Sequence, residues 1–467
     1  MMFHNSSDTI CAISTPPGRG GIAVIRISCA DVFAVCNQIF RPALFQSKNK
    51  NQKSKIKFGR IFRGEEILDE VLVSTFCAPH SYTGEDVVEI SCHGSLYIQQ
   101  EILKLLLAAG CRLATAGEFT QRAFLNGKLD LSQAEAVGDL IASSSAAAHR
   151  IAMQQMRGGI SNELANLRDK LLHFTSLVEL ELDFAEEDIE FADRKQLKDL
   201  ALQVETVICR LAGSFETGNA IKNGIPVAIV GETNAGKSTL LNRLLKEERA
   251  IVSDIHGTTR DAIEDTVVID GLMFRFIDTA GIRETHDAIE QLGIERTFRK
   301  IEQASIVLWI IDLTNDTQDI DQLSRQIIHR KENKKLILIL NKADLLTDEE
   351  CERKTLDFNR FNEDYMVISA RSDTDIAMLE RKLTEAANIP QIGENDVIIA
   401  NMRHYEALTL ALIAIRQVIS GLDNSISGDF LSQDIRECLY HLGEITGQQI
   451  GTEEVLGNIF SKFCIGK

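Results

Sequence analysis

One short motif in the middle of the chain carries the residue types that bind phosphate. Residues 231–238 read Gly-Glu-Thr-Asn-Ala-Gly-Lys-Ser and match the pattern G-x-x-x-x-G-K-[ST]. Its glycines allow backbone N–H groups to wrap phosphate oxygens, and the N-terminus of a following helix adds positive potential. Lys237 is expected to reach the β- and γ-phosphates and Ser238 to ligate Mg²⁺. The motif therefore predicts a nucleotide site, but it does not choose the base.

A second motif chooses the base. Asn341-Lys342-Ala343-Asp344 follows an apolar run of strand length at 336–340. The carboxyl end of such a strand is where open α/β sheets bind ligands. The Asp344 carboxylate can accept both N1–H and N2–H of guanine, whereas adenine offers no such pair of donors. Asn341 and Lys342 are expected to brace the loop and cover the base, and backbone donors of residues 369–371 are expected to meet the guanine oxygen.

The third element senses the γ-phosphate. Asp278-Thr279-Ala280-Gly281 follows a strand-like run at 273–277. Asp278 is expected to hold Mg²⁺ through water, and the Gly281 N–H to contact the γ-phosphate. Thr258-Thr259 precedes a further run at 265–269, with Thr259 as the second Mg²⁺ hydroxyl. The order of these elements predicts a GTPase of the Ras-like class.

The switch region lacks the usual water-orienting residue. Many small GTPases place Gln directly after the D-x-x-G glycine, but this chain has Ile282, which can neither orient water nor transfer a proton. The polar residues nearby leave several alternatives that the residues alone do not separate: Arg283, Glu284, Asp287 and Glu290.

The pattern of apolar and polar residues around these motifs predicts which strands and helices position them. Strand-length apolar runs alternate with helical stretches from 225 to about 387, as in a doubly wound α/β domain. Helical patterns flank this segment, from 129 to about 217 and at 401–421, 432–446 and from 452. Ser132 and Glu135 fit a capping box at the start of the first helical stretch. Residues 1–125 mix short apolar runs with helical patterns and predict an α+β domain.

The length of the chain indicates more than one domain, and its net charge excludes one class of protein. A chain of 467 residues exceeds the roughly 250–300 residues of one hydrophobic core. The net charge of −18 argues against a protein that simply coats nucleic acid. The basic stretch Lys48–Lys57 is interpreted as a solvated loop. With no membrane-length apolar run, no visible secretory signal and no C-x-x-C pair, we expect a cytoplasmic protein with reduced thiols and no membrane partner.

The flanks resemble a known family. Thr15-Pro16-Pro17-Gly18-Arg19-Gly20-Gly21, Thr83-Gly84-Glu85-Asp86, the segment 129–136 and the terminal Phe463-Cys464-Ile465-Gly466-Lys467 look like the MnmE (TrmE) family of tRNA modification GTPases. The resemblance covers essentially the whole chain. It implies a folate-binding, dimerising N-terminal domain (1–125), a helical domain built from two segments (126–222 and 388–467) and an inserted Ras-like G domain (223–387).

The resemblance also implies an activity and its partners. The family acts with a flavoprotein, MnmG, in which FAD resides, to install an aminomethyl-type (carboxymethylaminomethyl) group at C5 of the wobble uridine in certain tRNAs. A methylene-tetrahydrofolate supplies the carbon. The family functions as a homodimer, with a heterotetramer expected with the flavoprotein, and K⁺ in the nucleotide site supports GTP hydrolysis.

Site residues follow from the same resemblance. By this resemblance Glu290 takes the water-orienting role and Cys464 is a further catalytic candidate, while Arg283 stays a catalytic candidate from the switch segment itself. The expected K⁺ contacts are Asn234, Ser253, Ile255 and Thr258, and the expected folate contacts are Arg26, Glu89, Lys128 and Lys467. The full set of expected GTP contacts is Asn234, Ala235, Gly236, Lys237, Ser238, Thr239, Ser253, Thr258, Asp278, Thr279, Ala280, Gly281, Asn341, Lys342, Asp344, Ser369, Ala370 and Arg371.

One alternative from another class shares the same GTPase motifs. A GTP-switched factor that assembles ribosomes or RNA, without modification activity, would show an identical nucleotide site. The sequence shows no appended basic RNA-binding domain, and its flanks match the modification family. We therefore favour the modification GTPase.

Overall fold

In the computed structural model, the chain forms two compact units. It describes residues 8–43, 56–183, 194–232, 234–247, 265–277, 301–315, 334–356, 358, 364–390, 393, 396–424, 426–448, 463 and 466. The first unit comprises Met1–Ile141, Gln155–Thr206 and Ala407–Lys467, and the second comprises Ala142–Gln154 and Val207–Glu406. The second unit therefore extends beyond 223–387 on both sides, and the four domain limits expected from the sequence stay a prediction.

The first unit contains a seven-stranded sheet, in agreement with the α+β prediction. Its order is β3-β4-β5-β6-β2-β1-β7, with β1 parallel to β7 and the other neighbours antiparallel. The strands are β1 (Ile10–Ile13), β2 (Ile22–Ser28), β3 (Phe40–Pro42), β4 (Ile56–Arg63), β5 (Glu66–Phe76), β6 (Val87–His93) and β7 (Arg112–Leu113). The helices nearby are α1 (Val32–Ile39), α2 (Leu96–Ala108) and α3 (Glu118–Leu125).

The two faces of this sheet differ. Because side chains alternate along a strand, Ile25, Ile27 and Ile90 point to one face and form a core with apolar residues of α1 and α2. The opposite face leaves large apolar side chains exposed, namely Phe58 by 40% and Leu72 by 47%, which are cross-strand partners on β4 and β5. Along β4 and β5 this face of the sheet is thus apolar and exposed, whereas along β1 it carries a small core of Ile10, Ala12 and Phe119.

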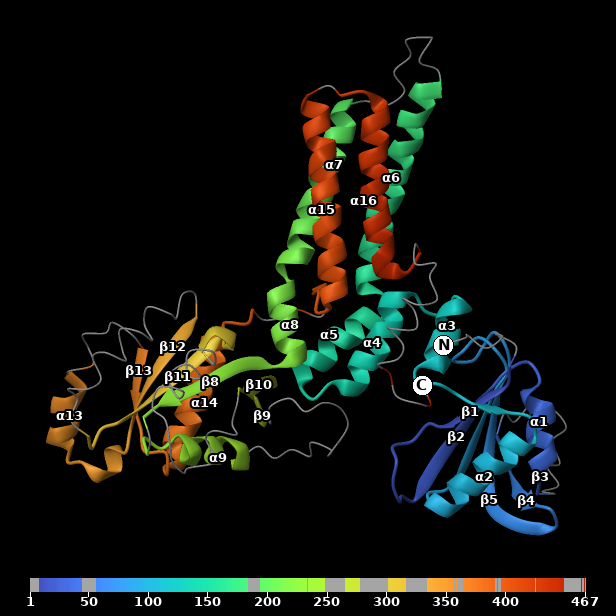
Figure 1. Cartoon of the computed structure of the whole chain (residues 1–467), viewed down its shortest axis with the longest axis horizontal. Helices are drawn as coiled ribbons and strands as arrows, with labels where there is room; N and C mark the ends of the chain where they lie inside the picture. Colours follow the sequence, from blue (N-terminus) through green and yellow to red (C-terminus); the bar gives the residue numbers. More distant parts are fainter. Residues whose placement is uncertain are drawn as a thin grey trace, which may run out of the picture. The chain divides into compact units, whose positions relative to one another are not determined.

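Helices from before and after the nucleotide motifs form a bundle in the same unit (Figure 1). They are α6 (Gly159–Asp183), the parts of α7 (Arg194–Gly213) and α15 (Met402–Asp423) that belong to this unit, and α16 (Gly428–Thr446); the shorter α4 (Leu131–Ala142) precedes them in the chain. Arg168 on α6 donates to the Leu439 carbonyl on α16 at 2.7 Å. Arg416 on α15 pairs with Glu205 on α7 at 2.7 Å. Segments that flank the nucleotide motifs therefore pack together, as the helical periodicity suggested.

The capping box at the start of α4 lies two residues before the predicted one. The Gln133 N–H donates to Asp130 Oδ1 at 2.8 Å, and the Asp130 N–H donates to Gln133 Oε1 at 3.0 Å. This reciprocal pair satisfies free N–H groups at the helix start. Ser132 lies inside the helix, where its hydroxyl meets that of Ser161 at 3.1 Å. The prediction that Ser132 and Glu135 form the capping box was wrong. Asp130 and Gln133, each two residues earlier in the chain, form the box with the same chemistry.

One described helix, α15, is long and apolar enough to cross a membrane by length and composition. The sequence had predicted no such segment. In the structure, 39% of its most apolar stretch is buried, and Leu408, Ala411 and Ile415 belong to the buried core. Helix α15 is thus partly buried within the fold.

The second unit contains a six-stranded sheet covered on both faces, which confirms the doubly wound α/β prediction. Its order is β13-β12-β11-β8-β10-β9, parallel except for β9. The strands are β8 (Ile225–Gly231), β9 (Asp265–Ile269), β10 (Leu272–Phe276), β11 (Ile306–Asp312), β12 (Lys335–Asn341) and β13 (Asp364–Val367). Other elements are α5 (Ala146–Met156), α8 (Phe215–Asn223), α9 (Lys237–Glu247), η3 (Ala343–Leu345), α13 (Asp348–Leu356) and α14 (Asp373–Ala387).

The strand order decides where the motifs meet. Leu240 of α9 and Leu379 of α14 pack on one face of this sheet, whereas Trp309 and Phe358 lie in the core of the other. Strand β8 lies between β11 and β10, so the chain leaves β8 where the order reverses. Ligands bind outside the carboxyl ends of strands at such a switch point.

Candidate nucleotide-binding site

The phosphate loop follows β8 and depends on two glycines. Gly231 has φ +151°, and a Cβ there would lie 2.2 Å from the Ile310 carbonyl oxygen of the neighbouring strand. Gly236 has φ +104°, and its Cβ would lie 2.1 Å from Nδ2 of Asn341. Both positions combine a conformation that other residues rarely adopt with no space for a side chain. The backbone of the loop is therefore not covered by side chains at these two positions, so that a phosphate could approach its N–H groups.

Lys237 begins the helix that follows this loop. Its ammonium donates to the carbonyl oxygens of Gly231 and Glu232, at 2.8 and 2.6 Å. Ser238 and Thr239 occupy the same first turn of α9, at the N-terminus of the helix. The structure thus brings the predicted lysine, hydroxyl and helix N-terminus to one end of the loop.

Asn341 ties three segments together. Its side chain is 2% exposed at the carboxyl end of β12. The Nδ2 group donates to the Ala235 carbonyl at 2.8 Å, and Oδ1 accepts the Ala370 N–H at 2.9 Å. The amide thereby holds the phosphate loop and the loop at 369–371 in fixed relation, which is the bracing role expected for it.

Lys342 is held by an acid that the sequence analysis missed. Lys342 has φ +68°, and its Nζ lies 2.5 Å from Oδ2 of Asp312. Oδ1 of Asp312 accepts from the backbone N–H and the hydroxyl of Thr314, at 2.9 and 2.6 Å. Burial favours a raised pKa for Asp312, but the bonds from Lys342 and Thr314 outweigh it and hold the pKa below its usual value. Asp312 ends a buried strand, the same signal that marked Asp344.

A cavity of about 170 Å³ opens between these segments. Asp344 lies on the short helix η3 and is exposed, with its neighbour Leu345 also on the cavity wall. Leu345 had not been predicted, whereas the other lining residues had: Gly236, Thr239, Asn341, Lys342, Asp344, Ser369, Ala370 and Arg371. The phosphate loop and the predicted base-reading residues therefore share one cavity.

The loop at 369–371 already uses its backbone donors. The Ser369 N–H donates to Asp375 Oδ2 at 2.8 Å, and the Arg371 N–H makes only a long bond, 3.4 Å, to the Ser369 hydroxyl. Together with the Ala370 bond to Asn341, these contacts fix the loop beside the cavity. A guanine oxygen would share these donors with the side chains that now accept from them.

Several predicted site residues lie outside the described residues. They are Ser253, Ile255, Thr258, Thr259, Asp278, Thr279, Ala280, Gly281, Arg283, Glu290, Cys464 and Lys467. Their roles stay predictions. Among the residues that the structure describes, no group of three or more His, Cys, Asp or Glu side chains is arranged to hold a metal ion.

A second cluster of predicted residues lies in the first unit. Arg26 and Glu89 face each other across β2 and β6, with Arg26 Nε donating to Glu89 Oε1 at 2.9 Å. The Arg26 guanidinium carbon lies 5.1 Å from the ring centre of Tyr82 and 5.6 Å from that of Phe119. Lys128 donates to the Pro79 carbonyl at 3.0 Å. Tyr82 and Phe119 had not been singled out, because neither lies in a motif that bears charge.

The end of the chain reaches the same unit. The Ser14 hydroxyl donates to the Gly466 carbonyl at 2.9 Å, directly after β1. A Cβ at Gly466 would lie 2.3 Å from the Ile13 carbonyl oxygen, and Gly466 has φ +96°. The penultimate residue is therefore fitted closely against the N-terminal sheet.

Comparisons with known proteins agree with this arrangement. Residues 9–128 match the family "GTP-binding protein TrmE N-terminus", and residues 131–464 match "MnmE helical domain". The tRNA modification GTPase MnmE of Bacteroides thetaiotaomicron is 59% identical over 466 residues, which cover 99% of this chain and 100% of that protein. The protein of the same name from Parabacteroides distasonis is 58% identical, covering 98% and 100%. The chain belongs to the MnmE family.

Membership in the MnmE family makes the chain a GTPase of the tRNA modification class, as the motifs and flanks had predicted. The three-part architecture expected from the sequence, with a TrmE-type N-terminal domain, an MnmE helical domain and a GTPase domain, is confirmed. A crystal structure of Era from Aquifex aeolicus bound to GDP and AlF4⁻ overlaps 40% of this chain and 66% of that one, at 26% identity and a TM-score of 0.28.

Proposed function

We propose that this MnmE-family GTPase modifies C5 of the wobble uridine of certain tRNAs, together with an FAD-containing flavoprotein of the MnmG type. The product carries an aminomethyl-type (carboxymethylaminomethyl) group whose carbon comes from methylene-tetrahydrofolate. The observation that carries the proposal is the single cavity shared by the phosphate loop and the base-reading residues, in a chain that matches MnmE over its full length.

GTP recognition divides between the two ends of that cavity. At one end the Asp344 carboxylate accepts the two guanine N–H groups, and Lys342 covers the base. At the other end the backbone of residues 234–239 surrounds the phosphates, and Lys237 transfers its donors from the loop carbonyls to phosphate oxygens. This exchange is inexpensive because the ammonium already lies at the loop rather than in solvent.

The donor set suits the two expected cations. Ser238, in the first turn of α9, and Thr259 would hold Mg²⁺, a hard cation that prefers oxygen ligands. The Asn234 amide and oxygens near Ser253, Ile255 and Thr258 would hold K⁺, and Asn234 has φ +65°, a left-handed conformation within the phosphate loop. Both cations would supply positive charge to the phosphates. Glu290 would orient the attacking water, since Ile282 cannot.

The cluster around Arg26 fits a folate. Its cofactor would carry carboxylates, which suit Arg26 and Lys128, and a pterin whose N–H pair suits the Glu89 carboxylate. Both Arg26 and Glu89 are only partly exposed, with side-chain exposures of 16% and 26%. Lys467 would complete the folate site. Its neighbour Gly466 fits closely against the end of β1 in the same sheet, and this contact supports the assignment.

Two further features concern where the expected partners, a second copy of the chain and tRNA, would bind. We place the homodimer contact in the N-terminal domain, where the exposed Phe58 and Leu72 support it. With a net charge of −18, weak general attraction to RNA favours a local tRNA surface or one on the flavoprotein. The cytoplasm is the expected compartment.

Two measurements test the proposal. Deleting the gene and measuring wobble uridines by mass spectrometry should abolish the modified nucleoside, and a plasmid copy should restore it. Unchanged modification would instead support the ribosome-assembly alternative. Hydrolysis of GTP measured in K⁺ and in Na⁺ at equal ionic strength should be faster in K⁺, and Asn234→Ala should remove that difference. Equal, very slow turnover in both salts would contradict a hydrolytic role.

A further inference from the structure

Arg26 is oriented by groups that lie outside every motif named above. One edge of its guanidinium meets Glu89, with Nη2 at 2.8 Å from Oε1. The Tyr82 and Phe119 rings, at 5.1 and 5.6 Å from the guanidinium carbon, are within the distance at which a ring face attracts a cation. Phe119 is fully buried, so its ring has little freedom to move. Two aromatic rings and a carboxylate thus hold a side chain that otherwise has many rotamers.

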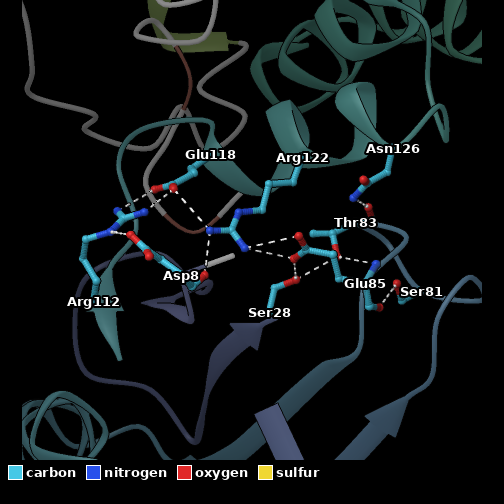
Figure 2. A network of polar contacts seen from close by, with 9 residues as sticks. All are labelled: Asp8, Ser28, Ser81, Thr83, Glu85, Arg112, Glu118, Arg122 and Asn126. Carbon is cyan, nitrogen blue, oxygen red and sulfur yellow. Dashed lines mark hydrogen bonds and ion pairs between the residues drawn. The ribbon is translucent and has the colours of Figure 1, made fainter. Parts of the chain in front are cut away.

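Tyr82 and Phe119 come from two different segments. Figure 2 shows neighbouring residues of both segments in the polar network that joins them. Tyr82 lies in the loop between β5 and β6, and Phe119 lies on α3. The Tyr82 hydroxyl meets the Thr120 hydroxyl at 2.8 Å. Arg122, 5% exposed, donates from Nη1 to Glu85 at 3.0 Å and from Nη2 to the Asp8 carbonyl at 2.8 Å. The loop is therefore fastened to α3 at Tyr82 itself and again at Glu85.

The same network reaches the base of the loop. Glu85 Oε2 accepts the Ser28 hydroxyl at 2.7 Å, and Ser28 lies two residues beyond Arg26 on β2. The buried Thr83 hydroxyl meets that of Ser28 at 2.7 Å, and the Thr83 carbonyl accepts from the Asn126 amide at 2.8 Å. Figure 2 shows Arg122 between the Glu118 and Glu85 carboxylates, at the centre of these contacts. A buried charge is tolerated when it is paired and hydrogen-bonded in this way.

We propose that Tyr82 and Phe119 are positioning residues for Arg26, and that the Arg122–Glu85 pair holds their two segments together. The inference rests on the proposed folate function, because Arg26 is the group that would meet the ligand. Its consequence is a division of labour: the rings and the buried pair fix where the guanidinium points, and Arg26 itself, with the other expected folate contacts, meets the ligand. Held in advance, Arg26 loses less conformational entropy on binding.

The experiment uses the full chain and separates the contribution of the Tyr82 ring from that of its hydroxyl group. Tyr82→Leu removes the ring over Arg26, whereas Tyr82→Phe keeps it and loses only the bond to Thr120. The matched control is Tyr97→Leu, the same change at an exposed tyrosine of α2 that donates to none of these groups. The first readout is the Arg26 Nε–H signal in a ¹H–¹⁵N spectrum of arginine-labelled protein, assigned with Arg26→Lys.

The NMR signal reports the position of Arg26 without any ligand. We expect Tyr82→Leu to move it toward the value of a free guanidinium, and Tyr82→Phe and Tyr97→Leu to leave it nearly in place. An unchanged Arg26 signal in Tyr82→Leu would overturn the proposal. Arg122→Lys, which keeps the charge but loses the forked geometry, should move the signal in the same direction, and a chain that melts as the wild type does would show that the effect is local.

The second readout is the Kd of 5-formyl-tetrahydrofolate, a stable reduced folate. A cation–ring contact of about 0.5–2 kcal/mol corresponds to a Kd raised about 2- to 30-fold in Tyr82→Leu, with GTP hydrolysis unchanged. A wild-type affinity in Tyr82→Leu would also overturn the proposal. If the wild-type chain bound no folate, the folate function would fall, while the NMR comparison would still decide whether Tyr82 positions Arg26.

Discussion

The Lys342 ammonium is bound to the Asp312 carboxylate, with Nζ 2.5 Å from Oδ2. Asp312 ends β11 and Lys342 follows β12, so a buried acid on one parallel strand orients the lysine at the end of the next, which we propose covers the base. Asp312 is 7% exposed, and its other oxygen is saturated by Thr314. The pair therefore links the proposed base-reading loop to the central strands of the sheet.

Asp312→Asn should weaken nucleotide binding without changing base choice. The variant keeps the size of the side chain but loses the charge-assisted bond to Lys342, and a loss of about 1 kcal/mol would raise the Kd for GDP roughly five-fold. Titration of a fluorescent GDP measures this effect. Lys342→Met and the double variant complete a cycle: if Asp312 acts through Lys342, the double variant binds like Lys342→Met. Additive losses would contradict that coupling.

Asp344→Asn should change which base is preferred. Guanine presents two N–H donors to the carboxylate, and an amide can accept only one of them. Xanthine carries an oxygen in place of the guanine amino group and suits the amide NH₂. Losing a bond to a charged acceptor worth about 1.5–3 kcal/mol lowers GDP affinity about 10- to 150-fold. Competition between GDP and XDP measures the exchange, and unchanged guanine selectivity would remove Asp344 from the base-reading role.

Glu290→Ala should separate binding from hydrolysis. If Glu290 orients the attacking water, GTP affinity stays near that of the wild type while the hydrolysis rate falls by about 10²-fold or more. Arg283→Ala, Glu284→Ala and Asp287→Ala are the matched controls from the same segment. Single-turnover assays in saturating K⁺ compare the four. A wild-type rate in Glu290→Ala, with the loss falling on one of the controls, would reassign the role.

Acid should loosen helix α3 before the β-sheet core. Burial tends to raise the pKa of Glu118, but its bonds to Arg112 and the Thr115 N–H, with the charges of Arg112 and Arg122, lower the pKa below its usual value. A carboxyl with a depressed folded pKa stabilises the fold above its unfolded pKa of about 4.3, and that stability is lost as pH falls through the folded value. Amide exchange of α3, compared at pH 6 and about pH 3.5, should show the loss of protection.

Glu118→Gln is the control for that pH dependence. Glutamine keeps the shape of the side chain but does not titrate, so α3 should exchange faster at pH 6 and show less additional loss on acidification. Equal acid sensitivity in both chains would place the titrating group elsewhere.

Much of this protein was readable from its sequence because the decisive features are local. Gly231 and Gly236, the strand before them and the helix after them are close in the chain, and the alternation of strand-length apolar runs with helical stretches predicts a doubly wound sheet. Cavity residues such as Asn341 and Asp344 could be named in advance because they follow buried strands, whose carboxyl ends converge. The flanking motifs indicated the family that the full-length comparisons then showed.

Other features depended on tertiary structure because they join distant segments through unremarkable residues. Asp312 orients Lys342 from a neighbouring strand, and Tyr82 and Phe119 meet Arg26 from a loop and a helix. No spacing in the chain encodes such contacts, since they depend on sheet register and on how α3 packs. The capping box shows the same limit at short range: two overlapping patterns, at Asp130 and at Ser132, were chemically equivalent. Only the packing of α4, which buries Ser132 and leaves Asp130 at the helix start, selected one.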